Sequence, residues 1–385
     1  MACYLLVPYS VPGHVRPMLA VAAELSARGD RVWMLVSGGF VDQVRLAGAV
    51  PVRLDVTPDV FVPERPLGRD WFGYLVERLR RPLINWRAAV QLARVVPWVR
   101  PDLVVVDPML AWADRVVRGG PVPSALLSTT FAGTPAALAE AARTRLGWVG
   151  APEWWYRWHP LARRVARGGR LVLANAVPGL QPAAGSGMSL VGPLLCRDRG
   201  EDVGWRQRLA AASGRLLFVS PGTVFARGRR FFLQIAESFA GSSWTVVAAT
   251  GRLDPVALGS LAPNFVACRW APQQLVLSRA DVFVTHGGMN STLEGILAGV
   301  PMVFAPRSAE QWLIAGRCVD RGVGVLLPGP GKICGVIEDL VSDSAVHDRL
   351  AEWRAELTAI RGACRAADLL STAVRSGRSP AGGLR

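Results

Sequence analysis

The sequence predicts an α/β protein of two domains, each a mainly parallel sheet wrapped by helices, with a deep cleft between them. Three observations favour this fold class. Short apolar runs alternate with helix-like segments along the chain, as in βαβ units. The chain has 385 residues, which is long enough for two domains. The pattern weakens between Leu180 and Trp205, where glycine, proline and charged residues gather. The carboxyl ends of two such sheets enclose a crevice of the kind that binds ligands.

The apolar runs give the expected strands in order. In the first half they are YLLVPYS, RVWMLVSGG, DLVVVDPML, PSALLSTT and LVLANAV. In the second half they are RLLFVSPGT, WTVVAATG, NFVACRWAP, DVFVTHGG, PMVFAPR and GVGVLLPG. We place the linker near residue 195, which predicts domains over residues 1–195 and 196–375. The last residues, 376–385, lack periodicity and are predicted to be a disordered tail.

Composition narrows the class of protein. The net charge is +15, but Lys332 is the only lysine among 44 basic residues, and no run of five or six like charges occurs. We interpret the excess of arginine as the codon usage of a GC-rich genome, and expect no nucleic-acid partner. No apolar stretch reaches the 18–20 residues or so that span a bilayer. Met1–Tyr9 has no basic leader and is expected to be a first strand. Six cysteines without a C-x-x-C pair favour the cytoplasm.

The first strand is followed by the loop YSVPGHVRP, and the pattern predicts a helix from Pro17 to Gly29. The loop does not match G-x-G-x-x-G, and no acidic residue follows the second strand at the ribose-binding position. A nicotinamide or flavin site is therefore disfavoured. The loop offers His14 instead, at the mouth of the predicted sheet.

Asp107 ends another buried run, LVVVDP, and could pair with His14. A carboxylate at the end of a buried strand is costly unless it is paired or faces a cleft. If Asp107 accepts a hydrogen bond from one imidazole nitrogen, the other nitrogen can take a proton from a hydroxyl. The alternatives remain open at this point: a loop histidine without a function, and an aspartate that caps a helix or turn.

The segment HGGMNSTLEG, residues 286–295, follows a predicted strand. Its glycines allow a sharp turn and a close approach of a ligand. A helix is expected from about Asn290 to Leu297, with Gly299 as its stop. Free N–H groups at Asn290, Ser291 and Thr292 would then form an anion site suited to a phosphate or diphosphate. Helix capping alone is the competing interpretation.

The surrounding segment, residues 270–311, reads WAPQQLVLSRADVFVTHGGMNSTLEGILAGVPMVFAPRSAEQ. It resembles the signature region of the UDP-dependent glycosyltransferase superfamily (family 1), especially its bacterial macrolide and antibiotic glycosyltransferases. LLFVSPGTVFARG, PYSVPGHVRPML and DLVVVDPMLAWA resemble family segments at the expected places. The resemblance covers essentially the whole chain, most weakly over residues 55–95 and after 330. It implies the GT-B fold, in which two Rossmann-like domains bind the acceptor (N-terminal) and the nucleotide-sugar donor (C-terminal).

The resemblance also implies roles for individual residues. His14 and Asp107 would be catalytic. Trp270 would stack on the base, Glu294 would bind the ribose, and Glu310 with Gln311 would bind the sugar. Many bacterial relatives have aspartate where this chain has Glu310, and the longer side chain shifts the reach of the carboxylate, so the sugar is less closely defined than the donor class. A glucose-like sugar is the first choice, with a deoxysugar or N-acetylglucosamine open. The donor-binding set is Gly222, Thr223, Trp270, Ala271, Gln273, His286, Gly288, Asn290, Ser291, Glu294, Glu310 and Gln311.

The expected reaction is transfer with inversion at the anomeric carbon, after His14 has taken the proton of an acceptor hydroxyl. No D-x-D triplet occurs in the chain, so we expect no metal at the diphosphate. No cofactor is expected beyond the co-substrate, a UDP-sugar first and a dTDP-sugar second.

The acceptor is less defined. Trp148 and Trp155 lie in the aromatic segment 147–160, which is either a wall for an aromatic or polyketide acceptor or a packed helix anchor. Trp112 is a third candidate acceptor contact. The basic segment 76–100 favours a solvated helix pair, with contact to a membrane or lipid as the alternative. Three hypotheses for the function therefore remain: a natural-product glycosyltransferase, a lipid glycosyltransferase and a non-catalytic nucleotide-sugar-binding subunit. A monomer or homodimer is expected.

Overall fold

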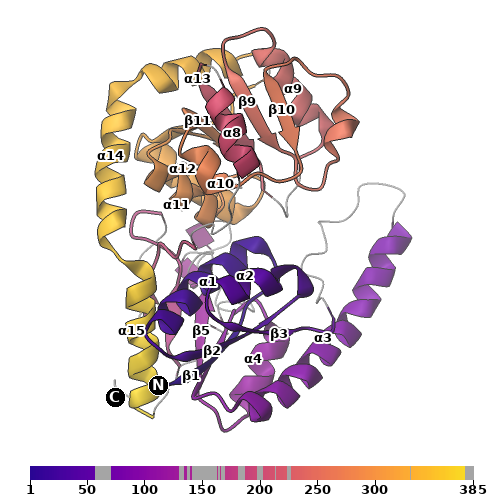
Figure 1. Ribbon diagram of the computed structural model, residues 1–385, viewed down its shortest axis with the longest axis vertical. Coiled ribbons are helices and arrows are strands. Elements are labelled where there is room, and N and C mark those ends of the chain that lie inside the picture. Colours follow the sequence, from indigo (N-terminus) through magenta and orange to yellow (C-terminus); the bar gives the residue numbers. More distant parts are fainter. Residues whose placement is uncertain are drawn as a thin grey trace.

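The computed structural model describes residues 1–56, 71–129, 134–136, 139–140, 163, 165, 170–180, 187–196, 203–212, 214–222, 227–329 and 331–377, with the backbone alone over 71–79. Two parallel sheets form its framework, one above the other in Figure 1. Within the ranges just given, no helix combines the length and the hydropathy that crossing a bilayer requires.

The first sheet has the strand order β3-β2-β1-β4-β5-β6-β7, and all its neighbouring strands are parallel. Its strands are β1 (Cys3–Val7), β2 (Arg31–Val36), β3 (Val50–Arg53), β4 (Leu103–Val106), β5 (Ser124–Ser128), β6 (Val172–Ala174) and β7 (Met188–Leu190). The described helices between them include α1 (Pro12–Ala27), η1 (Gly38–Phe40), α2 (Val41–Leu46), α3 (Trp71–Val99) and α4 (Ala111–Arg118).

Both faces of the first sheet are covered, because successive side chains of a strand point to opposite faces. In β1, Tyr4 and Leu6 belong to one apolar core, whereas Leu5 and Val7 belong to another. The first core includes side chains of α1, and the second includes side chains of α3 and α4. Burial on both faces explains why the strands appear in the sequence as continuous apolar runs.

The second sheet has the order β10-β9-β8-β11-β12-β13, again parallel throughout. Its strands are β8 (Leu216–Ser220), β9 (Thr245–Ala249), β10 (Phe265–Cys268), β11 (Val282–Thr285), β12 (Met302–Phe304) and β13 (Gly324–Leu326). Its helices are α8 (Val203–Ala211), α9 (Arg229–Phe239), η3 (Pro255–Leu258), α10 (Gln273–Leu277), α11 (Met289–Ala298), α12 (Ala309–Asp320), α13 (Ile333–Ser342) and α14 (Ser344–Ala359).

The last helix, α15 (Gly362–Arg375), returns to the first sheet (Figure 1). Ala366, Ala367, Leu370 and Ala373 are buried in the same core as α1. Tyr4 Oη lies 3.3 Å from the Ser371 hydroxyl. By sequence α15 falls in the predicted second domain, but by packing it completes the core of the first sheet. The domain boundary near residue 195 stays a prediction.

The expected strands are all present, and the α/β class with two parallel sheets is confirmed. Two strands were not expected. β3 and β7 are the edge strands of the first sheet, and β7 lies inside the segment predicted to be linker. The side chains of β3 are half-buried or exposed and those of β7 are half-buried, so neither strand needs the continuous apolar run that marks a central strand. The predicted tail lies outside the described residues from 378 onward.

Candidate functional site

Four polar side chains lie at the carboxyl edge of the first sheet. His14 lies in the first turn of α1 after β1, Asp107 directly follows β4, Thr129 directly follows β5, and Asn175 directly follows β6. These four strands are consecutive neighbours in the sheet. The carboxyl ends of parallel strands meet at one edge, so residues distant in sequence come together there. Sequence reasoning selected His14 and Asp107 but missed Thr129 and Asn175.

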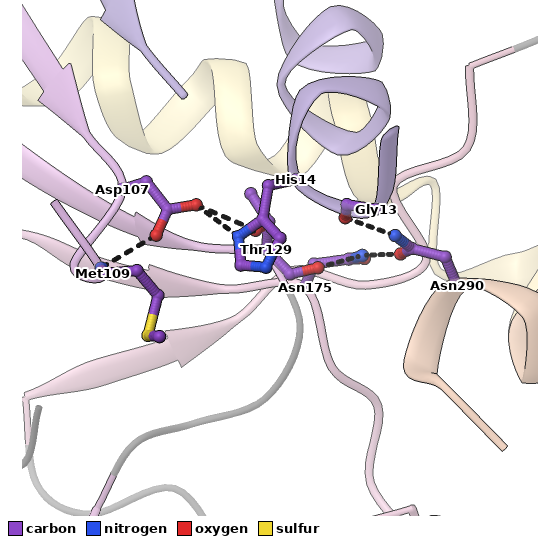
Figure 2. A network of polar contacts seen from close by, with 7 residues as sticks. All are labelled: Gly13, His14, Asp107, Met109, Thr129, Asn175 and Asn290. Atoms are coloured by element: carbon purple, nitrogen blue, oxygen red, sulfur yellow. Dashed lines mark hydrogen bonds and ion pairs between the residues drawn. The ribbon is translucent and has the colours of Figure 1, made fainter. Parts of the chain in front are cut away.

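His14, Asp107 and Thr129 form a hydrogen-bonded triangle (Figure 2). His14 Nδ1 lies 2.7 Å from Asp107 Oδ2. The Thr129 hydroxyl lies 2.6 Å from the same imidazole nitrogen and 3.0 Å from the same carboxylate oxygen. The Asp107 side chain is 1% exposed and that of His14 is 13% exposed. The contact expected between these two residues is therefore present, with a third partner that the sequence did not suggest.

The surrounding contacts determine which ring nitrogen of His14 carries a proton. Asp107 Oδ1 accepts a hydrogen bond from the Met109 N–H at 2.9 Å, which fixes the carboxylate plane. A carboxylate only accepts hydrogen bonds, so the proton of the hydrogen bond between Asp107 and His14 is assigned to His14 Nδ1. Nε2 then has a lone pair that can accept a proton from a hydroxyl group.

The loop before His14 is joined to the second sheet. Asn290 Nδ2 donates a hydrogen bond to the Gly13 carbonyl at 2.5 Å (Figure 2). The sequence placed the start of α1 at Pro17, which is wrong, because the helix begins at Pro12 and contains Pro17. In an α-helix residue 17 would donate to the carbonyl of residue 13, but proline has no N–H. The Gly13 carbonyl therefore lacks its helical donor and is available to Asn290.

The predicted anion loop has the expected geometry. β11 ends at Thr285, and Gly287 makes the turn with φ +78°. α11 then begins at Met289 and ends at Ala298, and the next residue, Gly299, has a left-handed backbone conformation. No side chain caps the amino end of α11. One expectation is wrong. The Thr292 N–H bonds the Gly288 carbonyl at 3.0 Å inside the helix, since it lies one position beyond the free first turn.

The imidazole of His286 is held between two glycines. A Cβ at Gly222 would lie 3.0 Å from the ring carbons, and a Cβ at Gly288 would lie 2.5 Å from Nε2. Burial lowers the pKa of His286 to about 4; the positive charge of Arg227 adds to this shift, while the Ser220 backbone opposes it. The ring is therefore neutral near pH 7.

The other donor-site candidates on the second sheet form one group. Trp270 is 57% exposed, as a stacking surface requires, and Ala271 behind it is buried. The Gln273 amide donates to Ser291 Oγ at 3.2 Å and also to Glu294. These contacts bring the residues predicted to bind the nucleobase, the phosphates and the ribose together along the amino ends of α10 and α11.

Glu294 also receives a side chain from the first sheet. Arg16 in α1 lies 3.5 Å from the Glu294 carboxylate, which is 5% exposed. Gln274 donates to the same carboxylate oxygen at 3.1 Å. Sequence reasoning missed Arg16, although its position two residues after His14 was a usable signal.

Glu310 and Gln311 lie in the first turn of α12, and their side chains differ in how free they are to bind a ligand. Gln311 Oε1 accepts from the Arg307 and Ser308 N–H groups at 2.8 and 3.3 Å, as part of a capping box. Only its amide nitrogen is left for a ligand. Burial raises the pKa of Glu310 to about 7, and the charge of His14 opposes the rise. The predicted base and the predicted sugar-binding carboxyl are therefore close enough to interact.

The remaining candidates are less informative. Trp112 is 8% exposed and belongs to the core under α3 and α4, with its indole N–H unpartnered among the described residues. Thr223, Trp148 and Trp155 lie outside the described residues.

Comparisons with known proteins agree with this layout. Residues 211–328 match the family described as "UDP-glucoronosyl and UDP-glucosyl transferase". The oleandomycin glycosyltransferase of Streptomyces antibioticus is 30% identical over 387 residues, covering 93% of this chain and 87% of that protein. The NDP-glycosyltransferase YjiC of Bacillus licheniformis is 26% identical over 396 residues, covering 94% and 95%.

Two solved structures are similar over nearly their whole length. The glycotransferase of kitacinnamycin superposes with a TM-score of 0.74 at 28% identity, covering 96% of this chain and 98% of that one. The calicheamicin glycosyltransferase CalG4 superposes with a TM-score of 0.70 at 27% identity, covering 97% and 98%.

Proposed function

The chain belongs to the UDP-dependent glycosyltransferase superfamily, has its GT-B fold and is a glycosyltransferase, and on this premise we propose its substrates and mechanism. The donor is a nucleotide diphosphate sugar, UDP-linked first and dTDP-linked second, with a glucose-like sugar as first choice. The acceptor is a hydroxyl of a small natural product. The names of the similar oleandomycin and calicheamicin enzymes support this acceptor class.

The proposal divides the work between the two sheets. Residues 1–195 bind the acceptor and supply the base, and residues 196–375 bind the donor. The observation that carries the proposal is the position of the base. His14, oriented by Asp107 at 2.7 Å, directly follows Gly13, whose carbonyl binds Asn290 at the start of α11. The base of one sheet thus adjoins the uncapped helix end of the other.

The proposed reaction is a single displacement. The acceptor hydroxyl gives its proton to His14 Nε2 as its oxygen forms a bond to the anomeric carbon. The bond from that carbon to the diphosphate oxygen breaks on the opposite face, and the nucleoside diphosphate leaves with the electron pair. The anomeric configuration is therefore inverted.

The leaving group needs stabilisation of its negative charge. The free N–H groups of the first turn of α11 and the Ser291 hydroxyl are suited to this, with the helix dipole behind them. Neutral His286 can donate one hydrogen bond without the desolvation cost of a buried cation. Trp270 stacks on the nucleobase of the donor. Glu294 accepts hydrogen bonds from the ribose hydroxyls, and Glu310 accepts them from the hydroxyls of the transferred sugar.

The test combines binding with turnover. Wild-type protein is incubated with UDP- and dTDP-sugars, and melting shifts, donor hydrolysis and transfer to a panel of hydroxylated natural products are measured. We expect His14→Ala to lower turnover by about 10²–10⁴-fold and to keep the melting shift given by UDP. His347→Ala is the matched control, because His347 is an exposed histidine on α14. Equal turnover in His14→Ala and wild type would remove the base from the mechanism, and retention of configuration in the product would exclude the single displacement.

One observation keeps the lipid acceptor as a second candidate. On α3, Leu83 and Trp86 are 51% and 61% exposed, and Arg87 beside them is also exposed. An apolar and basic helix face suits an anionic lipid surface. Sedimentation with anionic vesicles at physiological salt tests this. No binding by the wild-type protein would discard the lipid acceptor.

A further inference from the structure

A pair of asparagine side chains connects the two sheets. Asn175, at the end of β6, is fully buried, and its Nδ2 lies 2.7 Å from Asn290 Oδ1 at the start of α11. Asn175 Nδ2 also donates to the Thr129 carbonyl at 3.1 Å, and its Oδ1 accepts from the Leu194 N–H at 2.8 Å. Both hydrogens of the buried Nδ2 are therefore donated and Oδ1 accepts one hydrogen bond. The bond to Asn290 joins the two sheets (Figure 2).

Backbone partners fix the orientation of both amides. A backbone N–H only donates and a backbone carbonyl only accepts. The Leu194 N–H therefore requires Asn175 Oδ1 on its side, which turns Nδ2 toward Thr129 and Asn290. The Gly13 carbonyl likewise requires Asn290 Nδ2, which turns Oδ1 toward Asn175. Neither side chain can flip without placing two donors or two acceptors against each other.

The pair holds the backbone on both sides of the base. Gly13, whose carbonyl binds Asn290, is bonded covalently to His14. Thr129, whose carbonyl binds Asn175, places its hydroxyl 2.6 Å from His14 Nδ1. A shift of either carbonyl moves the imidazole or its hydroxyl partner. The position of the base is thus determined partly by an amide that does not touch it.

Asn290 has one hydrogen left for the donor. Its amide nitrogen carries two hydrogens, and among the described residues it bonds the Gly13 carbonyl alone. The second N–H is available to the leaving diphosphate. The same side chain can therefore contact the diphosphate and hold the loop of the base, which would couple donor binding to the position of His14.

We propose that Asn175 is a positioning residue for the transfer reaction, acting through Asn290 and Thr129 to hold His14 in line with the donor. This inference rests on the proposed function. Misplacement of a catalytic group by about 1 Å can lower a rate by roughly 10²-fold. We therefore expect Asn175→Ala to lower kcat by about 10- to 100-fold and to change the donor KM by less than about threefold.

Two further variants separate positioning from stability. Asn175→Asp keeps the acceptor for the Leu194 N–H and removes only the two donations, so it should lower kcat as well. The control is Asn264→Ala. The Asn264 amide also donates to backbone carbonyls, those of Phe239 at 2.7 Å and Trp244 at 2.9 Å, but at the opposite edge of the second sheet. It should lower the melting temperature and leave kcat unchanged.

A spectroscopic measurement keeps the test independent of turnover. The chain has four histidines, so ¹⁵N-histidine spectra are simple, and His14→Ala identifies the His14 signals. We expect Asn175→Ala to change the ring ¹⁵N shifts of His14, and Asn264→Ala to leave them unchanged. If both Asn175 variants fail to fold, Asn290→Ala breaks the same bridge at a half-buried position and should change the same signals.

The outcomes are distinct. Unchanged His14 signals and unchanged kcat in a folded Asn175 variant overturn the inference, and so do unchanged His14 signals in Asn290→Ala. Equal losses of kcat in Asn175→Ala and Asn264→Ala overturn it as well, because they indicate a stability effect. If the wild-type protein transfers no sugar from any donor while the Asn175 variants still change the His14 signals, the proposed function fails and the positioning link stands.

Discussion

Replacing Asp107 by asparagine should be more damaging than removing its side chain. The Met109 N–H donates to Asp107 Oδ1 at 2.9 Å, so an asparagine would keep its oxygen there. Its NH2 group would then face His14 Nδ1, which is 2.7 Å away in the native structure. The imidazole would have to accept at Nδ1 and carry its proton on Nε2. In that tautomer Nε2 cannot take a proton from the acceptor hydroxyl.

The magnitudes follow from the two kinds of loss. Asp107→Ala removes a charge-assisted hydrogen bond worth about 1.5–3 kcal/mol, so we expect a loss of about 10- to 100-fold in kcat. Asp107→Asn also inverts the tautomer. In serine proteases the same substitution beside a catalytic histidine costs about 10⁴-fold. We therefore expect about 10³–10⁴-fold for Asp107→Asn. Donor affinity should be retained, since the side chain of Asp107 bonds His14, Thr129 and the Met109 N–H, none of which belongs to the donor-binding set.

The assay is initial-rate transfer at saturating donor and acceptor, with donor affinity measured separately by calorimetry. Asp114→Asn is the matched control. Asp114 is also a buried aspartate of the first sheet's helices, and its ion pair with Arg170 at 2.7 Å has no part in the proposed reaction. It should lose stability and keep kcat. A rate for Asp107→Asn equal to or above that of Asp107→Ala would refute the tautomer argument.

Three further predictions concern pH and backbone strain. The folded-state pKa of Glu310 is about 7, above its usual 4.5, so the free energy of unfolding should fall as the pH rises from 4.5 to 7. Denaturant titrations across this interval should show that Glu310→Gln removes this pH dependence. The folded-state pKa of His286, about 4, lies below its usual 6.5, so stability should fall as pH drops through that interval, and an unchanged acid slope in His286→Asn would contradict this. Gly222 has φ +90° and abuts the His286 ring, so Gly222→Ala should cost about 1–3 kcal/mol in unfolding free energy and weaken UDP binding; native-like UDP affinity would argue against a phosphate position there.

The central strands were predictable and the edge strands were not, for a physical reason. β4 is buried on both faces and appears in the sequence as an uninterrupted apolar run. β3 contains Pro51, and β7 has three half-buried residues. An edge strand is covered less and tolerates proline, so its sequence carries a weaker signal. The segment predicted to be linker therefore concealed β7.

The site was predictable where chemistry made a residue conspicuous. An aspartate after a buried strand requires a partner, and this requirement pointed from Asp107 to His14. Thr129 and Asn175 occupy the same kind of position, but a neutral threonine or asparagine at a strand end is ordinary. The contact of Asn290 with Gly13 was beyond sequence reasoning, because it joins residues 277 positions apart and depends on a proline inside a helix.

The packing of α15 has a consequence for building hybrid enzymes. The helix shares a core with α1, and Arg28 forms an ion pair with Asp368 at 2.5 Å. A chimera that exchanges acceptor specificity by a single crossover near residue 195 would leave one parent's α15 against the other parent's α1. We expect functional hybrids to require two crossovers, so that residues 362–375 travel with the first half of the chain.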